Sequence, residues 1–156
     1  MKTIVVLSDT HGYKRGIEEL DAIFKESDLI IHLGDTSADG NFIASKYPEK
    51  THVINGNCDL PKLGADEEII QAEDVKILAC HGHRYSVKTT LARLAERAKE
   101  LGCKLALYGH THIPREDEID GVMIVNPGSA TRYGARSYLY IVINGEKIIT
   151  KSVTTG

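Results

Sequence analysis

The sequence predicts an α/β (mixed α+β) domain in which two β-sheets pack face to face and helices flank them. In the first half, short β-branched runs alternate with helical patterns, which is typical of βαβ units. In the last third, strands follow one another through short turns, which favours antiparallel pairing. A chain of 156 residues has the length of one domain, so a single domain over residues 1–156 is expected.

Hydrophobic periodicity locates the individual elements. Apolar, β-branched runs predict strands, at residues 2–8, 29–35, 51–55, 75–81, 104–110, 121–126, 137–143 and 146–153. Apolar residues at helical spacing predict helices, at about residues 15–26, 38–46 and 87–101. Gly102 closes the last helix, and Asn144-Gly145 is a strong hairpin signal between the last two strands.

Composition narrows the compartment and the partners. A formal net charge of −3 with scattered basic residues argues against a dedicated nucleic-acid surface. Cys58, Cys80 and Cys103 are odd in number and widely spaced, which favours reduced thiols in the cytoplasm. The opening apolar run is too short for a signal peptide, and no stretch is long enough to span a membrane.

Polar residues gather at five places where an apolar run stops. These are SDTH (8–11), LGD (33–35), NGNCD (55–59), CHGH (80–83) and YGHTH (108–112). Ligands of open α/β sheets sit beyond the carboxyl ends of the strands, so these endings are expected to converge on one cleft. Asp9/His11 and His110/His112 are i, i+2 pairs, whose side chains point the same way in an extended chain.

Each of these motifs alone also has an ordinary explanation. Residues 8–11 could cap the first helix, Asp35 could close a turn with Gly34, and Asn55-Gly56 is a common tight-turn dipeptide. Their co-occurrence favours a functional site, because five of the seven histidines lie in these endings and only His32 and His52 lie elsewhere.

The endings supply too many ligands for one tetrahedral ion. The oxygen and nitrogen donors are Asp9, His11, Asp35, Asn57, His81, His110 and His112. Two divalent ions about 3.5–4 Å apart would use all seven, and a bidentate Asp35 is the natural bridge between them. Two such ions, less two aspartates and one bridging hydroxide, leave a formal charge of +1, which suits a phosphodiester monoanion.

The order D-x-H, G-D, G-N-x-D, H-G-H, G-H-T-H resembles the calcineurin-like metallophosphoesterase superfamily, and the short chain resembles its small phosphodiesterase branch. The resemblance runs from Asp9 to Ser129. It implies two sheets between helices, with a binuclear centre at the sheet edges. It assigns the first ion to Asp9, His11 and His112, the second to Asn57, His81 and His110, and the bridge to Asp35.

The resemblance further implies hydrolysis of a P–O bond by a water or hydroxide that bridges the two ions. The residues assigned to catalysis are Asp35, Asn57, Cys58 and His81. Nitrogen and oxygen ligands suit several metals, with Mn²⁺ or Ni²⁺ favoured by the resemblance and Fe, Co or Zn left open. The expected partner is a small phosphodiester substrate, and the sequence leaves open whether the chain forms a homo-oligomer.

Cys58 refines the expected substrate. In many superfamily members, a histidine that assists the leaving group stands at this position. A thiol is a poorer proton donor than an imidazolium, since its ordinary pKa is ~8.5 and that of imidazole is ~6.5. A diester with an activated leaving group needs less help from an acid, so we expect diesters to be preferred over alkyl monoesters.

Several further residues have both a functional and a structural interpretation. His83 could face the cleft or lie on the surface, and Asp59 could orient Asn57 or cap its turn. Asn126 to Ser129 match a family loop near the centre. Possible phosphate contacts are Arg132 and Arg136, and a possible basic rim comprises Arg84, Lys88, Arg93 and Arg97.

The sequence leaves two rival functions. The first is a non-catalytic protein-binding scaffold of this fold, which would be expected to lack some ligands, whereas all seven positions are filled here. The second is a phosphomonoesterase or nuclease of the same superfamily, although 156 residues leave little room for DNA-binding elements. The chain carries no nucleotide-binding P-loop, no G-x-G-x-x-G motif and no G-x-S-x-G nucleophile elbow.

Overall fold

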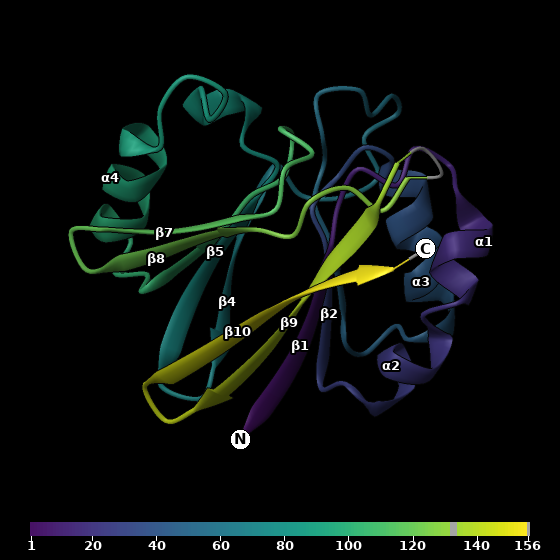
Figure 1. The fold of residues 1–156 in the computed structure, drawn as a ribbon, viewed down its shortest axis with the longest axis horizontal. Coiled ribbons are helices and arrows are strands. Elements are labelled where there is room, and N and C mark those ends of the chain that lie inside the picture. The colour runs from purple at the N-terminus through teal and green to yellow at the C-terminus, as the bar shows by residue number, and fades with distance from the viewer. Residues whose placement is uncertain (132–133, 156) are drawn as a thin grey trace.

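A computed structural model describes residues 1–131 and 134–155, which form two sheets packed face to face between two layers of helices (Figure 1). The first sheet has the order β10-β9-β1-β2-β3, with β1 (Lys2–Leu7), β2 (Leu29–His32), β3 (Thr51–Val53), β9 (Arg136–Asn144) and β10 (Lys147–Thr155). The second has the order β4-β5-β6-β8-β7, with β4 (Glu67–Ala72), β5 (Val75–Cys80), β6 (Leu105–Leu107), β7 (Arg115–Ile119) and β8 (Val122–Asn126). The predicted fold class is confirmed.

The main core lies between the two sheets. Ile4 and Val6 of β1 point into it, and they meet apolar side chains of the second sheet such as Ile77 and Leu105. The alternate residues of β1, Val5 and Leu7, pack on the other side against the helices. Because both faces of β1 are covered, its sequence is a continuous apolar run rather than an alternating one.

Helices cover the outer face of each sheet (Figure 1). Beside the first sheet lie α1 (Lys14–Glu18), α2 (Asp21–Glu26) and α3 (Ser37–Lys46), with Ile17, Phe24 and Ile43 buried against it. Beside the second sheet lies α4 (Ala92–Glu100), which buries Leu94, Ala95 and Ala98. None of the helices in the described part of the chain is long and apolar enough to cross a membrane.

Two predicted helices differ from the observed ones. The helix expected over residues 15–26 is divided into α1 and α2 near Leu20, which adopts the cap position of α2. The helix expected over residues 87–101 starts only at Ala92, because Gly82 and Ser86 adopt left-handed conformations around a short 3-10 helix, His83–Tyr85, and residues 86–89 form turns.

Two strands were not predicted, and one pairing was predicted wrongly. The edge strands β4 and β7 are rich in acidic residues because their outer positions face solvent. The last third of the chain is not wholly antiparallel, since β8 pairs in parallel with β6 and antiparallel with β7. The next strand, β9, joins the other sheet beside β1, so the chain crosses between sheets after Asn126.

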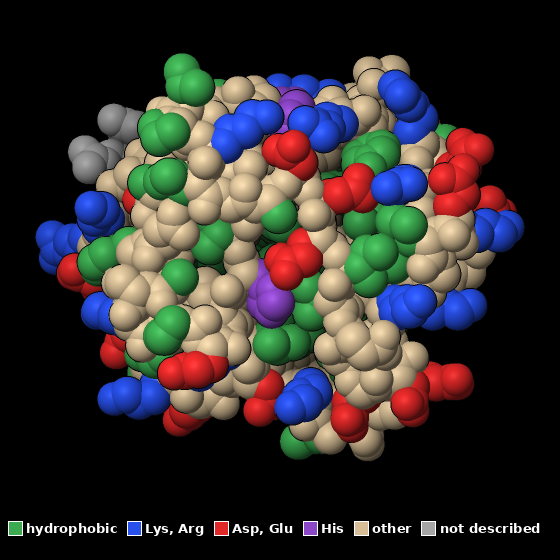
Figure 2. Space-filling model, turned by 180° about the vertical axis from the view of Figure 1, so that it is seen from behind, with side chains coloured by type: hydrophobic (Ala, Val, Ile, Leu, Met, Phe, Trp, Pro, Cys, Tyr) green, Lys and Arg blue, Asp and Glu red, His purple; other side chains and the backbone are tan. Residues whose placement is uncertain are grey.

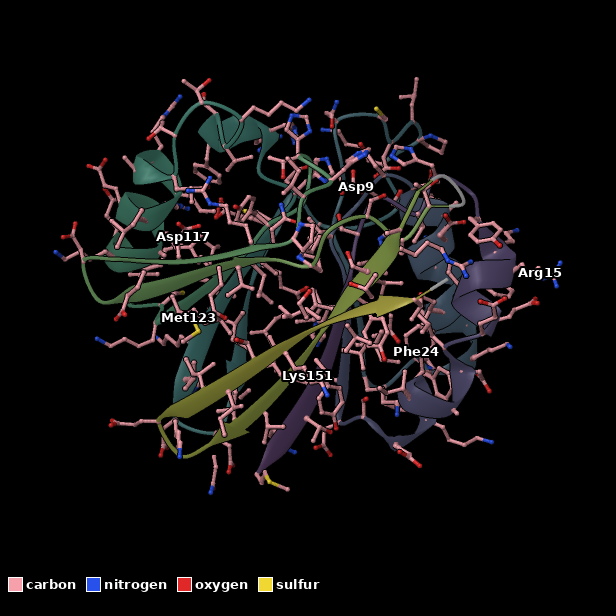
Figure 3. All side chains as sticks on the ribbon, viewed as in Figure 1. Asp9, Arg15, Phe24, Asp117, Met123 and Lys151 are labelled. Atoms are coloured by element: carbon pink, nitrogen blue, oxygen red, sulfur yellow. The ribbon has the colours of Figure 1, made fainter. Side chains whose placement is uncertain are left out.

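The loops that follow β1, β2, β5, β6 and β8 meet at one end of the sandwich. The amide of Ala130 donates to the carbonyl of Ser8 (3.1 Å), and the amide of Gly109 donates to that of His81 (2.9 Å). Figure 3 shows Asp9 at this end, whereas Met123 and Lys151 lie further down the two sheets. On the back of the molecule, acidic and basic side chains are interspersed around a central hollow (Figure 2).

Candidate metal centre

Five of the seven predicted ligands have left-handed backbone conformations. The φ angles are 54° at Asp9, 47° at His11, 46° at Asp35, 68° at His110 and 66° at His112. For a residue with a side chain this conformation costs roughly 1–2 kcal/mol. Such strained positions cluster at functional sites, where the surrounding structure holds them in place. The loops are therefore shaped to direct these side chains rather than to relax the backbone.

We call Asp9, His11, Asp35, His81, His110 and His112 the cluster. Asp9 lies at its centre and is fully buried. Its Oδ2 atom accepts hydrogen bonds from the Ser8 hydroxyl (2.6 Å) and the His110 amide (3.1 Å). Its Oδ1 atom has no hydrogen-bond partner among the described residues. Oδ1 lies 3.1 Å from Nε2 of His112 and 3.8 Å from Nε2 of His11. A buried acceptor left free in this way is aimed at something that protein groups do not supply.

His81 presents a second free buried atom. Its Nδ1 lies 2.7 Å from the carbonyl oxygen of Leu33, so in the neutral ring the proton sits on Nδ1 and Nε2 is an acceptor. Nε2 makes no hydrogen bond in the described structure, although it lies 3.3 Å from Oδ2 of Asp35 and 3.9 Å from Oδ1 of Asp9. A backbone carbonyl on one ring nitrogen is the usual support of a histidine that binds a metal through the other.

These atoms fit divalent cations. The ligand atoms fall into two groups, and within each group they all lie within 4.8 Å of one another. One group is Asp9, His11 and His112, and the other is Asp9, Asp35 and His81. Ligands about 2.0–2.2 Å from one ion are separated from each other by roughly 3–3.6 Å, which matches the shorter spacings observed. The carboxylate shared by the two groups is that of Asp9, and the bridging role of Asp35 stays a prediction.

Asp35 is held by the loop that carries Asn57. Its Oδ1 accepts the amide of Cys58 (3.0 Å), and its own amide donates to Oδ2 of Asp59 (3.1 Å). A Cβ atom on Gly56 would lie 2.0 Å from Oδ1 of Asp35, so only glycine allows this approach. Asp59 also accepts the amides of Gly56 (2.6 Å) and Ser37 (2.7 Å). It therefore both closes the turn and fixes Asp35.

The other predicted site residues lie at different depths. The ring of His110 stands 5.1 Å from that of His81, centroid to centroid, which places it beside the second group. Asn57 and Cys58 are exposed, and their side chains contact each other, Nδ2 of Asn57 donating to Sγ of Cys58 at 3.6 Å. Within the described structure, no hydrogen bond joins the Asn57 amide to Asp9, Asp35 or His81.

Electrostatics divides the titratable groups of the cluster. Burial acts to raise the pKa of Asp35, but His81 and the Cys58 amide outweigh it and hold that pKa below its usual range. Burial acts to lower the pKa of His81, but the two carboxylates outweigh it and raise that pKa. Burial and neighbouring positive groups lower the pKa of His110. In the metal-free protein, Asp35 is thus held ionised beside an imidazole, His81, whose pKa is raised.

Cys58 and His83 flank the predicted ligands, and their pKa values shift in opposite directions. Desolvation and the Asp35 carboxylate raise the pKa of the Cys58 thiol, which keeps it protonated at neutral pH. Desolvation and His81 lower the pKa of His83, whose half-buried ring lies 5.6 Å from that of His81. Its Nδ1 is buried with no hydrogen-bond partner in the described residues. His83 therefore faces the cluster, as one of its two interpretations expected.

The arginines named from the sequence are mostly engaged elsewhere. Arg136 pairs with Glu19 (3.3 Å) and lies over the ring of Tyr13, and Arg132 lies outside the described residues. In the expected basic rim, Arg84 pairs with Asp66 and Arg97 with Glu67, Arg93 donates to Ser86, and Lys88 is exposed. These contacts favour the structural interpretation of the arginines that the structure describes.

The loop after β8 braces the cluster from behind. The side-chain amide of Asn126, at the end of β8, donates from Nδ2 to the Gly109 carbonyl and to the Thr111 hydroxyl, both at 3.0 Å. The Ser129 hydroxyl donates to the Asp9 carbonyl at 2.8 Å. Sequence reasoning placed this loop near the centre. It missed Ser8, which orients the Asp9 carboxylate, although a hydroxyl directly before a predicted ligand is a usable signal.

Fold and site together define a protein built to bind metal ions at the strand ends of an α/β sandwich. The family model of the calcineurin-like phosphoesterase superfamily domain matches residues 1–147. The chain belongs to this metal-dependent superfamily.

Two similar proteins of other organisms are named as phosphoesterases. The chain is 37% identical over 132 residues to a probable metallophosphoesterase of Bacillus subtilis, covering 81% of this chain and 73% of the relative. It is 28% identical over 148 residues to a phosphodiesterase of Methanocaldococcus jannaschii, covering 83% and 85% of the two chains.

Solved structures share the fold. A predicted phosphoesterase of Streptococcus pneumoniae superposes with a TM-score of 0.84 at 26% identity, covering 98% of this chain and 89% of that one. Vps29 of Entamoeba histolytica, solved as a zinc complex, superposes with a TM-score of 0.77 at 20% identity over 97% and 98% of the two chains. At that identity, the Vps29 likeness concerns the fold alone.

Proposed function

We propose that this protein is a metal-dependent phosphodiesterase that hydrolyses a P–O bond of a small phosphodiester with the help of two divalent cations. One observation carries the proposal: two buried ligand atoms, Oδ1 of Asp9 and Nε2 of His81, lack hydrogen bonds within the described structure and face each other across 3.9 Å. The family and the similarity to a phosphodiesterase of M. jannaschii support the reaction class.

In this proposal, the first cation is held by Asp9, His11 and His112, and the second by Asn57, His81 and His110, with Asp35 between them. Bound there, the cations would lower the pKa of water towards neutrality and neutralise charge on the phosphoryl oxygens. The nitrogen and oxygen donors suit Mn²⁺ or Ni²⁺, which we expect to support activity best, and also Fe, Co and Zn.

The protein groups prepare the site for this chemistry. The Leu33 carbonyl keeps the proton of neutral His81 on Nδ1, and the Cys58 amide together with Asp59 fixes Asp35. Asn57 contributes a neutral oxygen, so the cluster has few enough carboxylates to leave net positive charge for an anionic substrate. Asn57 is exposed, as are His11 and His112 among the proposed ligands.

Preference for diesters rests on the group that faces the leaving oxygen. Cys58 stands in the predicted leaving-group position with a raised thiol pKa, so it is a weak proton donor. His83 has a lowered pKa and is neutral near pH 7, which also limits it as an acid. A leaving group of low basicity therefore suits this site, and we expect diesters to react faster than alkyl monoesters.

The test combines metal analysis with an assay of bis(p-nitrophenyl) phosphate and of an alkyl monoester, glycerol 2-phosphate. Wild type loaded with Mn²⁺ is expected to hydrolyse the diester faster, and Asn57→Ala to lose most of that activity. Asn144→Ala changes an exposed asparagine at the end of β9 and should behave as wild type. A metal-loaded wild type that hydrolyses neither substrate would contradict the proposal and favour a scaffold role.

A further inference from the structure

A chain of hydrogen bonds runs beneath the metal centre, from the loop after β2 to the turn that carries Asp9 and His11. The amide of Gly34 donates to Nδ1 of His32 (3.1 Å), and Nε2 of His32 lies 3.0 Å from the Thr10 hydroxyl. The Thr10 hydroxyl donates to Oδ2 of Asp39 (2.5 Å). We call His32, Thr10 and Asp39 the relay.

The direction of every proton in the relay is fixed. Because Gly34 donates to Nδ1, the neutral His32 ring carries its proton on Nε2 and donates it to Thr10. With that bond accepted, the Thr10 hydroxyl is free to donate onward to the carboxylate of Asp39. Each donor thus meets an acceptor, and such complete networks hold a single conformation more firmly than separate bonds do.

The relay is sealed from water. His32 and Thr10 are completely buried, and Asp39 is 1% exposed. Burial lowers the pKa of His32 to about 4, so the ring stays neutral at the pH of most assays. Asp39 lies in the first turn of α3, where the free amides of the helix favour a negative charge.

Both ends of the relay reach backbone that positions ligands. Gly12, which has φ of +83° and follows His11, donates its amide to the same Oδ2 of Asp39 (2.8 Å). Gly34, which precedes Asp35, accepts the Asp9 amide at its carbonyl (2.9 Å). The Asp35 carbonyl in turn accepts the His11 amide (3.1 Å). The two loops and the relay thus form closed rings of hydrogen bonds.

This arrangement opposes the strain of the turn. Asp9 and His11 both have positive φ, which is strained for residues with a side chain, so the turn would relax if it were released. Thr10 sits between the two ligands and is anchored from below by two hydrogen bonds. With its side chain anchored, Asp9 and His11 stay directed at the cluster.

We propose that His32, Thr10 and Asp39 are positioning residues that hold Asp9 and His11 in the geometry required to bind the first cation. The inference rests on the proposed function for the identity of the ligands. It adds a specific claim, that affinity for the first cation depends on a buried hydroxyl that touches no ligand directly. Groups that orient metal ligands typically contribute 10–100-fold to metal affinity.

The test is a calorimetric titration of the metal-free protein with Mn²⁺ and, separately, Zn²⁺. Thr10→Val removes the hydroxyl and keeps the branched shape, and Thr10→Ser restores the hydroxyl. We expect Thr10→Val to weaken binding of the first cation by ~10-fold or more and to change the affinity for the second cation by less than about threefold. Thr10→Ser should bind both cations with affinities close to those of wild type. His11→Ala, which removes a proposed ligand, identifies the binding step that belongs to the first cation.

The control separates positioning from general stability. Ser27→Ala removes another buried hydroxyl, which donates to the Ile23 carbonyl (2.6 Å) at the end of α2, and should leave both affinities unchanged. If Thr10→Val does not fold, Thr10→Ala carries the same test, because it also removes the hydroxyl that joins His32 to Asp39. Wild-type affinity in the variant that folds would overturn the relay's role. A wild type that binds no cation would instead overturn the proposed function.

Discussion

Oδ1 of Asp9 lies 3.1 Å from Nε2 of His112, although Asp9 follows β1 in the first sheet and His112 follows β6 in the second. The contact joins the two halves of the sandwich at the point where their loops meet. Asp9 is fully buried and this oxygen has no hydrogen bond in the described structure. Burying the carboxylate without a cation therefore costs free energy at the contact between the two sheets. Metal binding and the cohesion of the two sheets should therefore be coupled.

Cys58→His tests the explanation of substrate preference. An imidazole at this exposed position would supply a better proton donor than a thiol whose pKa is raised. We expect the ratio of kcat/KM for an alkyl monoester to kcat/KM for a p-nitrophenyl diester to rise by roughly 10-fold or more, within the ~10²–10⁴-fold range of general acid catalysis. The measurement is steady-state kinetics on glycerol 2-phosphate and bis(p-nitrophenyl) phosphate, with Cys58→Ser as the control for loss of the thiol. An unchanged ratio would show that position 58 does not assist the leaving group.

Asp59→Asn tests the anchor beneath Asp35. The carboxylate accepts three backbone amides while 7% exposed, and an asparagine would turn one N–H toward a donor. We expect a loss of about 2 kcal/mol in the free energy of unfolding, measured with urea on metal-free protein. Asp66→Asn, which alters an exposed pair with Arg84, should cost less than about 1 kcal/mol. Equal losses in the two variants would refute the anchor.

His32 predicts a specific dependence of stability on pH. Its pKa in the folded protein is about 4, below the ordinary value of 6.5, so the folded state binds fewer protons between these values. Stability from the neutral ring is present above pH ~6.5 and is lost as pH falls towards ~4. Between pH 7 and pH 5 this amounts to about 2 kcal/mol.

The comparison that isolates this effect is urea unfolding of wild type and His32→Asn, in the presence of a chelator. Other histidines titrate in both proteins, so their contribution cancels in the difference. From pH 7 to pH 5, the free energy of unfolding of His32→Asn should fall by about 2 kcal/mol less than that of wild type. Parallel pH profiles would mean that His32 is not held neutral by burial.

Much of the fold could be predicted because its central strands are unusually clear. The apolar runs of β1, β2 and β5 are buried on both faces, and their polar endings mark the carboxyl ends where the loops converge. The edge strands β4 and β7 escaped prediction because solvent-facing positions give them a mixed, acidic sequence. The parallel pairing of β8 with β6 is a long-range contact that local turn signals do not encode.

Some residues of the site could be predicted from the sequence, and others could not. Asp9, His81 and His112 could be named from residue type and spacing, and the structure brings their ligand atoms together. The relay could not, because a buried histidine in β2 and an aspartate in α3 look like ordinary core and helix residues until the chain is folded. The ligand assignments themselves, including Asn57 and the Asp35 bridge, remain predictions.

Equilibrium dialysis with Mn²⁺ and Zn²⁺ tests the central claim most directly, by counting the cations bound per chain. The wild type should bind two, and Asp9→Asn, which changes the carboxylate shared by both groups, should lose tight binding of at least one. Asp120→Asn, in an exposed turn where asparagine tolerates the positive φ, should bind two. A wild type that binds no cation, or an Asp9→Asn variant that binds two as tightly as wild type, would contradict the account.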